Sequence, residues 1–168
     1  MLSDPIVVTA VAGSATVAAI VDLKTRRVPN WLTLGIAAIG ISMAVAHLDG
    51  VSPLGALEGL AVGLLLMLPG HAIGRTGAGD VKLLAAVGTM LGPQAVMMAF
   101  LYTAIAGGAL AVLVAIGRGS LRRTIESTAT LMRTGGANAA DIEKTGVDNR
   151  FAYAPAIAAG ALVAAIWR

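Results

Sequence analysis

Six stretches of this chain are dominated by apolar residues, with hardly a charge inside them, and they constrain its fold more than any other feature. They cover residues 5–21, 31–48, 54–69, 81–91, 94–117 and 151–167. A helix needs about 20 residues to cross the hydrocarbon core of a membrane, within a range of about 17–25. Four stretches meet this criterion, residues 54–69 are marginal, and residues 81–91 are short because Gly92 and Pro93 follow them. The pattern predicts an all-α, polytopic membrane protein with about six transmembrane helices.

The composition agrees with a membrane protein. Hydrophobic residues make up 57% of the chain and charged residues only 12%, whereas about 25% of the residues in a soluble domain are charged. We expect the 168 residues to form one membrane-embedded domain. Because no basic residue precedes the first stretch, we expect a membrane helix there rather than a cleaved leader. The absence of cysteine excludes disulfides, thiol catalysis and cysteine-ligated zinc.

The positions of Lys and Arg predict the orientation of the helices. Eleven of the twelve fall on one side of a six-helix arrangement, in the connections around residues 24–27, 75–82 and 118–150. Since basic loops stay in the cytoplasm, both termini are expected outside, with the chain as a multi-pass protein of the inner membrane. We attribute the basic isoelectric point of about 9.8 to these loops and expect no nucleic-acid partner.

The connection at about residues 118–150 is the one long loop between the apolar stretches. Within it, residues 120–133 place apolar side chains at helical spacing with arginines between them. This pattern is typical of a basic helix on the inner leaflet. Such a helix serves either as an anchored linker, which we favour, or as a gate for the substrate.

Two aspartates stand where apolar stretches meet the cytoplasmic side. Asp22 follows the first stretch and Asp80 precedes the fourth, so two crossings return the chain to the same face. Two carboxyl groups within a few Å do not both ionise readily, and one keeps its proton. The ionised partner can take a proton from water while the protonated partner donates to a carbonyl oxygen, which hydrolyses a peptide without a metal. Asp22 and Asp80 are therefore the candidate catalytic pair.

The loop before Asp80 contains Gly77 and Gly79, which allow unusual backbone conformations and close approach to Asp80. Structural roles remain open for both acids. Asp80 can serve as the N-cap of the helix that follows it. Asp22 can act as a counter-charge to the basic residues after it.

The other polar residues are weaker candidates for a functional role. Glu58 lies in the third stretch, near its outer end and far in depth from the aspartate pair. His71 is expected in the cytoplasmic loop after that stretch, and His47 and Asp49 are expected at the outer boundary, in water. Pro155 is expected to bend the last helix.

Two motifs resemble those of the type IV prepilin peptidases, membrane aspartyl proteases with a G-x-G-D loop. DLKTRRVPNWLT, which begins at Asp22, resembles the family's Asp at the end of the first core helix, followed by a basic stretch and Pro-Asn. GAGDVKLLAAVG, residues 77–88, resembles the G-x-G-D loop that opens a helix and precedes a Lys. The closing AYAPAIAAGAL is similar to the family's proline-containing last helix.

The resemblance implies an endopeptidase that cuts the basic leader from a membrane-inserted prepilin or pseudopilin at the cytoplasmic membrane surface. It implies that Asp22 and Asp80 are catalytic and that Gly77 and Gly79 shape the active-site loop. Larger members carry a cysteine-paired region associated with N-methylation. This cysteine-free chain resembles the minimal form of Flp/Tad-type pilus systems or of archaeal preflagellin peptidases, and its Ala-rich composition favours the bacterial system. We expect no metal, no cofactor and no methyltransferase activity.

Three other functions remain open. Presenilin-like enzymes share G-x-G-D, but their partner motif is normally Tyr-Asp, which this chain lacks. A small transporter or proton channel can use Asp22 and Asp80 as a relay, although both acids are expected at one surface. A non-catalytic assembly protein would tolerate Asn at either position.

Overall fold

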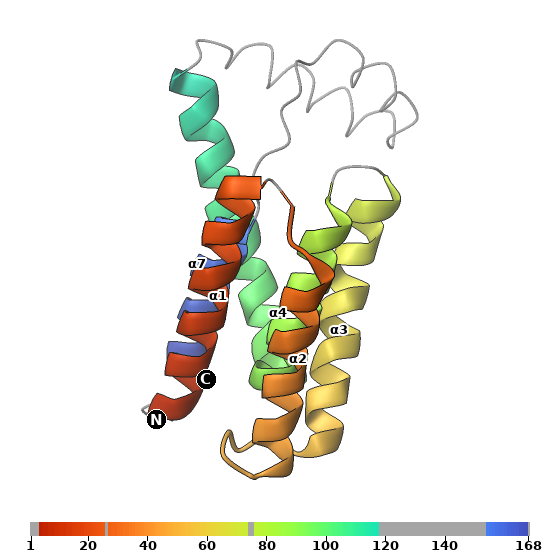
Figure 1. Cartoon of the computed structure of the whole chain (residues 1–168). Helices are drawn as coiled ribbons and strands as arrows, with labels where there is room; N and C mark the ends of the chain where they lie inside the picture. Colours follow the sequence, from red (N-terminus) through yellow and green to blue (C-terminus); the bar gives the residue numbers. More distant parts are fainter. Residues whose placement is uncertain (1–3, 26, 74–75, 118–153, 168) are drawn as a thin grey trace.

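The computed structural model describes residues 4–25, 27–73, 76–117 and 154–167, and all regular structure in these ranges is helical. Figure 1 shows five helices packed as a bundle. The helices are α1 (Pro5–Thr25), α2 (Asn30–Val45), α3 (Pro53–Ala72), α4 (Ala78–Gly117) and α7 (Ala154–Ile166). The prediction of an all-α fold is confirmed for these residues.

The helices run alternately up and down the bundle. α1 ends, α2 begins and α3 ends at the upper end in Figure 1, and both ends of α4 lie at this end as well. α7 starts towards the same end and runs down, so the described chain begins and finishes at the lower end. We call these the upper and lower ends of the bundle.

α4 reverses direction at Gly92, whose backbone has φ 76° and ψ 175°. A side chain makes this conformation strongly unfavourable, so glycine is required here. Pro93 reinforces the break because the residue before a proline is disfavoured in helical conformation. The result is two arms, residues 78–91 and 93–117. The break predicted between the fourth and fifth apolar stretches is therefore confirmed.

Several helix boundaries differ from those of the apolar stretches. α1 continues past residue 21 to Thr25, and α3 continues past Pro69 to Ala72, so His71 is helical rather than in a loop. Polar residues do not end these helices, because a helix satisfies its backbone hydrogen bonds locally whatever side chains it carries. The expected bend at Pro155 is wrong. This proline is in the first turn of α7, where its missing N–H breaks no helical hydrogen bond.

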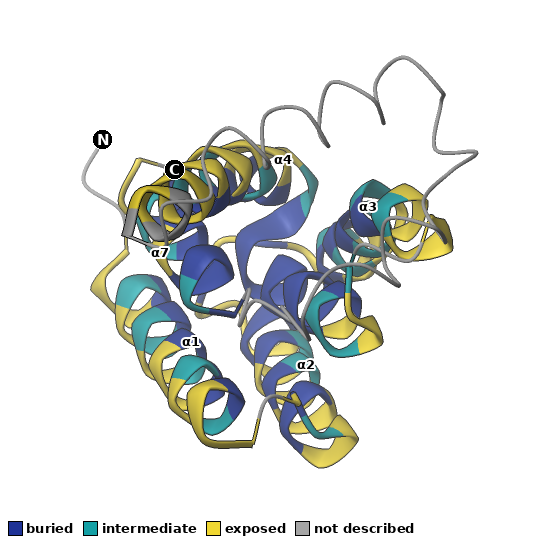
Figure 2. Cartoon of the chain, turned by 90° about the horizontal axis from the view of Figure 1, so that it is seen from above, coloured by how far each residue is buried: buried dark blue, intermediate teal, exposed yellow. Residues whose placement is uncertain are grey.

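The first arm of α4 forms the centre of the bundle. Its residues 83–92 are all buried, and they appear as the dark blue segment between the other helices in Figure 2. α4 packs most extensively against α3 and α7. A helix that is apolar and buried on every side is positioned by the shapes of its neighbours.

Small residues let the other helices approach this arm closely. A Cβ atom at Gly59 of α3 would overlap the carbonyl oxygen of Gly88, and one at Gly63 would lie 2.9 Å from the Cα of Ala85. Gly59 and Gly63, one helical turn apart, therefore lie at the α3–α4 contact, and such pairs of small residues are common between helices in lipid. Equivalent close contacts pair Gly40 with Thr89 and Gly160 with Thr103.

The outer surface of the bundle is rich in apolar side chains. Leu34 is 69% exposed, Ile105 66% and Leu65 63%, on three different helices. Among the described residues, three segments are long and apolar enough to cross a membrane: Pro5–Thr25, Pro53–Ala72 and Ala78–Leu113. Asn30–Val45 and Ala154–Ile166 are shorter apolar helices. An apolar surface around an apolar core suits a lipid environment.

The Gly59–Gly88 contact predicts a stability difference between two Gly→Ala variants. Gly59→Ala should lower the midpoint of thermal unfolding in detergent, because overpacking against a backbone costs about 1–3 kcal/mol. Gly35→Ala is the matched control, since a Cβ there meets nothing within 4 Å. It should raise stability slightly, because Ala is favoured over Gly within a helix. Equal unfolding midpoints for the two variants would contradict the close contact.

Candidate active site

Asp22 lies in the last turn of α1, at the upper end of the bundle, and its side chain is only 5% exposed. Its Oδ2 accepts a long hydrogen bond of 3.4 Å from the backbone N–H of Ala154, at the start of α7. The first N–H groups of a helix lack partners within it and attract negative charge. Asp22 is therefore held between the end of one helix and the start of another.

Asp80 lies in the first turn of α4, half-buried, at the same end. Its backbone N–H donates to the carbonyl oxygen of Gly77 at 3.1 Å, while the Gly77 N–H donates to the Asp80 carboxylate. A Cβ at Gly77 would lie 3.0 Å from Asp80 Oδ2. The absence of a side chain at Gly77 thus allows the carboxylate to fold back over the loop.

The structure brings the two aspartates together. Asp22 and Asp80 are close enough for their negative charges to repel each other. Each is withdrawn from water, and each keeps one backbone hydrogen-bond donor. Two carboxyl groups in such surroundings can share a proton and act as an acid–base pair. The expectation that both lie at one end of the bundle agrees with this placement.

Gly79 is the point at which the α1–α2 connection touches the start of α4. A Cβ at Gly79 would lie 3.1 Å from the Cβ of Val28 and 3.2 and 3.3 Å from its backbone N and O. Val28 is itself buried. Gly77 precedes α4, whereas Gly79 lies in the first turn of α4 rather than in the loop where it was expected. The two glycines therefore serve different contacts, because Gly77 accommodates the Asp80 carboxylate and Gly79 accommodates the α1–α2 connection.

A side-chain hydrogen bond joins the same two regions. Lys82 Nζ donates to Oδ1 of Asn30, the first residue of α2, at 3.0 Å. Sequence reasoning gave neither Asn30 nor Lys82 a role, and it also missed Val28. The available signal was that Asn30 and Lys82 belong to the two motifs that contain the aspartates.

The remaining candidate residues lie apart from the pair. His71, in the last turn of α3, places its Nδ1 2.9 Å from the carbonyl oxygen of Thr76, next to the glycine loop. Glu58 is exposed and lines a cavity of about 580 Å³ at the lower end, together with Gln94, Tyr102 and Trp167. This cavity is thus at the opposite end from the aspartates.

Asp49 is a correction to the sequence analysis. It was expected in water, yet it is only 2% exposed. Its Oδ1 accepts a 3.0 Å hydrogen bond from the backbone N–H of Val51. Asp49 therefore stabilises the tight α2–α3 turn, where His47 has a positive φ of 55°.

Two expectations cannot be compared with the fold. The basic helix at residues 120–133 and the rest of the 118–150 loop lie outside the described residues. Among the residues that the structure describes, no three His, Asp or Glu side chains gather as a metal site requires.

The type IV leader peptidase family matches the chain over residues 9–112, more than half of its length. This range contains both aspartates and both loop glycines, while α7 lies beyond it. No curated protein and no solved structure matches the chain significantly. The family and the three long apolar helices together indicate a membrane peptidase of the prepilin-processing kind. On the extent of this match, the chain belongs to the type IV leader peptidase family.

Proposed function

We propose that this protein is an aspartic endopeptidase in which Asp22 and Asp80 activate water to cut the leader from a membrane-inserted prepilin or pseudopilin. The observation that carries the proposal is the pairing of two withdrawn carboxyl groups at one end of the bundle. The family supplies the class of substrate. A Flp-type pilin precursor is the specific substrate we favour.

The pair performs the reaction through a single shared proton. The ionised carboxylate takes a proton from water, and the resulting hydroxide attacks the carbonyl carbon of the scissile peptide. The protonated carboxyl gives its proton to the carbonyl oxygen. The tetrahedral intermediate then collapses and the C–N bond breaks. The leaving nitrogen receives the proton that was taken from water, and the other carboxylate takes back the proton of the intermediate's hydroxyl group as the carbonyl re-forms, so that the pair again holds one proton. The proton belongs to the pair rather than to one residue.

The proposed orientation places this reaction at the cytoplasmic face. The upper end holds the basic residues of the α1–α2 connection, which favours the cytoplasmic side. If each arm of α4 crosses the membrane, the chain has six crossings with both termini outside. Residues 118–150 are then a cytoplasmic loop, and the protein is a multi-pass protein of the inner membrane.

A proton relay or transporter is less well supported. A relay needs ionisable groups along its path through the membrane. Among the described residues, the acids other than the pair are Asp4, Asp49 and Glu58, and these lie towards the lower end. Between its two ends, the described part of the bundle has no acidic side chain that could pass a proton along.

Replacement of either aspartate should abolish cleavage. Asp22→Asn and Asp80→Asn should each lower kcat/KM by about 1,000-fold or more, because members of a catalytic unit are individually indispensable. The measurement is cleavage of a purified prepilin by the purified enzyme in detergent or liposomes. Glu58→Gln, which removes an exposed carboxylate at the far end, is the control and should cleave like the wild type. Near-normal activity of either Asn variant would refute the mechanism.

The shared proton also predicts the dependence on pH. The rate should pass through a maximum and fall on both sides, because low pH protonates both carboxyl groups and high pH ionises both. The profile of kcat/KM against pH measures this, with Glu58→Gln expected to keep the wild-type shape. A rate that rises to a plateau and never falls at high pH would show that no acid is required.

Cysteine labelling tests the six-crossing arrangement in a chain without native cysteine. Single replacements His47→Cys and Gln94→Cys should react with a membrane-impermeant thiol reagent added outside spheroplasts. Lys24→Cys should react only after the membrane is opened. Protection of Gln94→Cys from the external reagent would mean that the two arms of α4 do not both cross.

A further inference from the structure

Hydrogen bonds of Thr25 link the end of α1 to the connection that precedes α2. Thr25 Oγ1 lies 2.8 Å from the carbonyl oxygen of Val21 and 2.7 Å from that of Arg27, which ties the turn to the last turn of α1. α2 then begins at once, with Leu32 N–H donating to the Pro29 carbonyl oxygen at 3.1 Å. These hydrogen bonds lie along the short connection between Asp22, near the end of α1, and Asn30, at the start of α2.

Asn30 is itself fixed by the first turn of α2. The buried Thr33 hydroxyl donates to the Asn30 carbonyl oxygen at 3.0 Å. The side-chain amide of Asn30 is then presented to α4, where its Oδ1 accepts the 3.0 Å hydrogen bond from Lys82 Nζ. A bond from an ammonium group to a neutral acceptor is stronger than one between two neutral groups.

Lys82 and Asp80 are two residues apart on α4, so their side chains leave the helix on different faces. Asp80 is within electrostatic range of Asp22, and Lys82 forms a hydrogen bond with α2. The hydrogen bond pulls the two elements together, while the contact of Gly79 with Val28 limits how closely they approach. The attractive hydrogen bond and the close contact act at the same place and together define one distance between the start of α4 and the α1–α2 connection.

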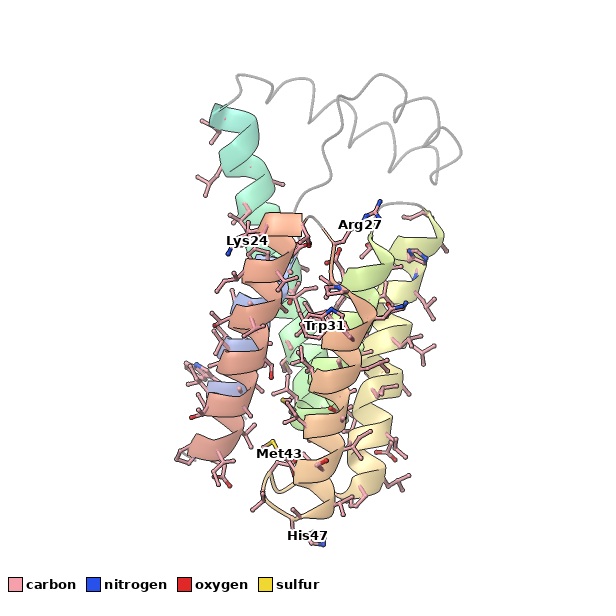
Figure 3. The ribbon with its side chains drawn as sticks, in the orientation of Figure 1. Lys24, Arg27, Trp31, Met43 and His47 are labelled. Atoms are coloured by element: carbon pink, nitrogen blue, oxygen red, sulfur yellow. The ribbon has the colours of Figure 1, made fainter. Side chains whose placement is uncertain are left out.

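The charge of Lys82 alone does not account for this arrangement. Lys24 stands two residues after Asp22, as Lys82 stands two residues after Asp80. Figure 3 shows Lys24 pointing away from the bundle, and its side chain is exposed. The two lysines share a charge and a spacing from an aspartate, but the Lys82 side chain spans two helices.

We propose that Asn30 and Lys82 are positioning residues whose hydrogen bond sets the spacing of Asp22 and Asp80. The inference rests on the proposed function, because it concerns the alignment of that catalytic pair. Both side chains are exposed, so the bond contributes little to overall stability. Its effect is on geometry, and small displacements of reacting groups lower rates steeply.

A double-mutant cycle on cleavage tests this role. Lys82→Met and Asn30→Ala should each lower kcat about 10-fold or more with little change in KM and in the unfolding midpoint. The double variant should be no slower than the slower single variant, because both changes break the same bond. Lys82→Arg and Asn30→Asp keep a donor and an acceptor and should retain most of the activity. Lys24→Met is the matched control for loss of a lysine and should cleave like the wild type.

Three outcomes would overturn the proposal. A rise in KM at constant kcat would make Lys82 a substrate contact, and losses that multiply in the double variant would show independent roles. Wild-type kcat in both single variants would remove the role altogether. The aspartate variants distinguish failure of the proposed function from failure of the positioning role. Cleavage by Asp22→Asn or Asp80→Asn would refute the proposed function itself. Inactive aspartate variants beside fully active Asn30 and Lys82 variants would refute only the positioning role.

Discussion

The close packing around the first arm of α4 is the constraint on which the rest of the structure depends. This arm is buried along residues 83–92, and at Ala85 and Gly88 it brings its backbone into close contact with α3. Van der Waals contact between closely approaching helices is the main attraction available where lipid surrounds the bundle. Asp80 lies in the first turn of this arm, so the packing that positions the arm also brings that carboxylate to the upper end of the bundle, where α1 ends.

The reversal at Gly92 gives this arm its central place. A chain that continued straight through residues 78–117 would carry its apolar surface far beyond the bundle, whereas the break lets the second arm return beside α7. Gly92 permits the non-helical backbone conformation, and Pro93 disfavours a helical conformation at the residue before it. Gly92 thus acts on the arrangement of the bundle, while Gly77 and Gly79 act within one turn of Asp80. Glycine therefore determines the arrangement of the helices at one position and permits close contacts near Asp80 at two others.

The sequence was sufficient to predict the helices, the break and the placement of both aspartates at one end of the bundle, because each follows from hydropathy, from local backbone preference or from counting crossings. Helix ends such as Thr25 and Ala72 were missed, since hydropathy marks where a segment is apolar and not where its hydrogen bonding stops. The burial of Asp49 was missed for a related reason. A charged residue near a boundary suggests exposure, but the carboxylate is needed inside the turn to accept the Val51 N–H.

The Asn30–Lys82 hydrogen bond is a contact that no local sequence pattern predicts. Its partners are 52 residues apart in the chain, on helices whose relative rotation depends on how Gly40, Gly59 and Gly63 pack against α4. Sequence can place both residues at the upper end, yet only the rotation of each helix decides which side chains face one another. The relative orientation of the side chains at the site therefore depends on contacts deep in the bundle. Apolar packing brings the helix ends near one another, and on the proposed role of Asn30 and Lys82 a single polar contact is then enough to align the two acids.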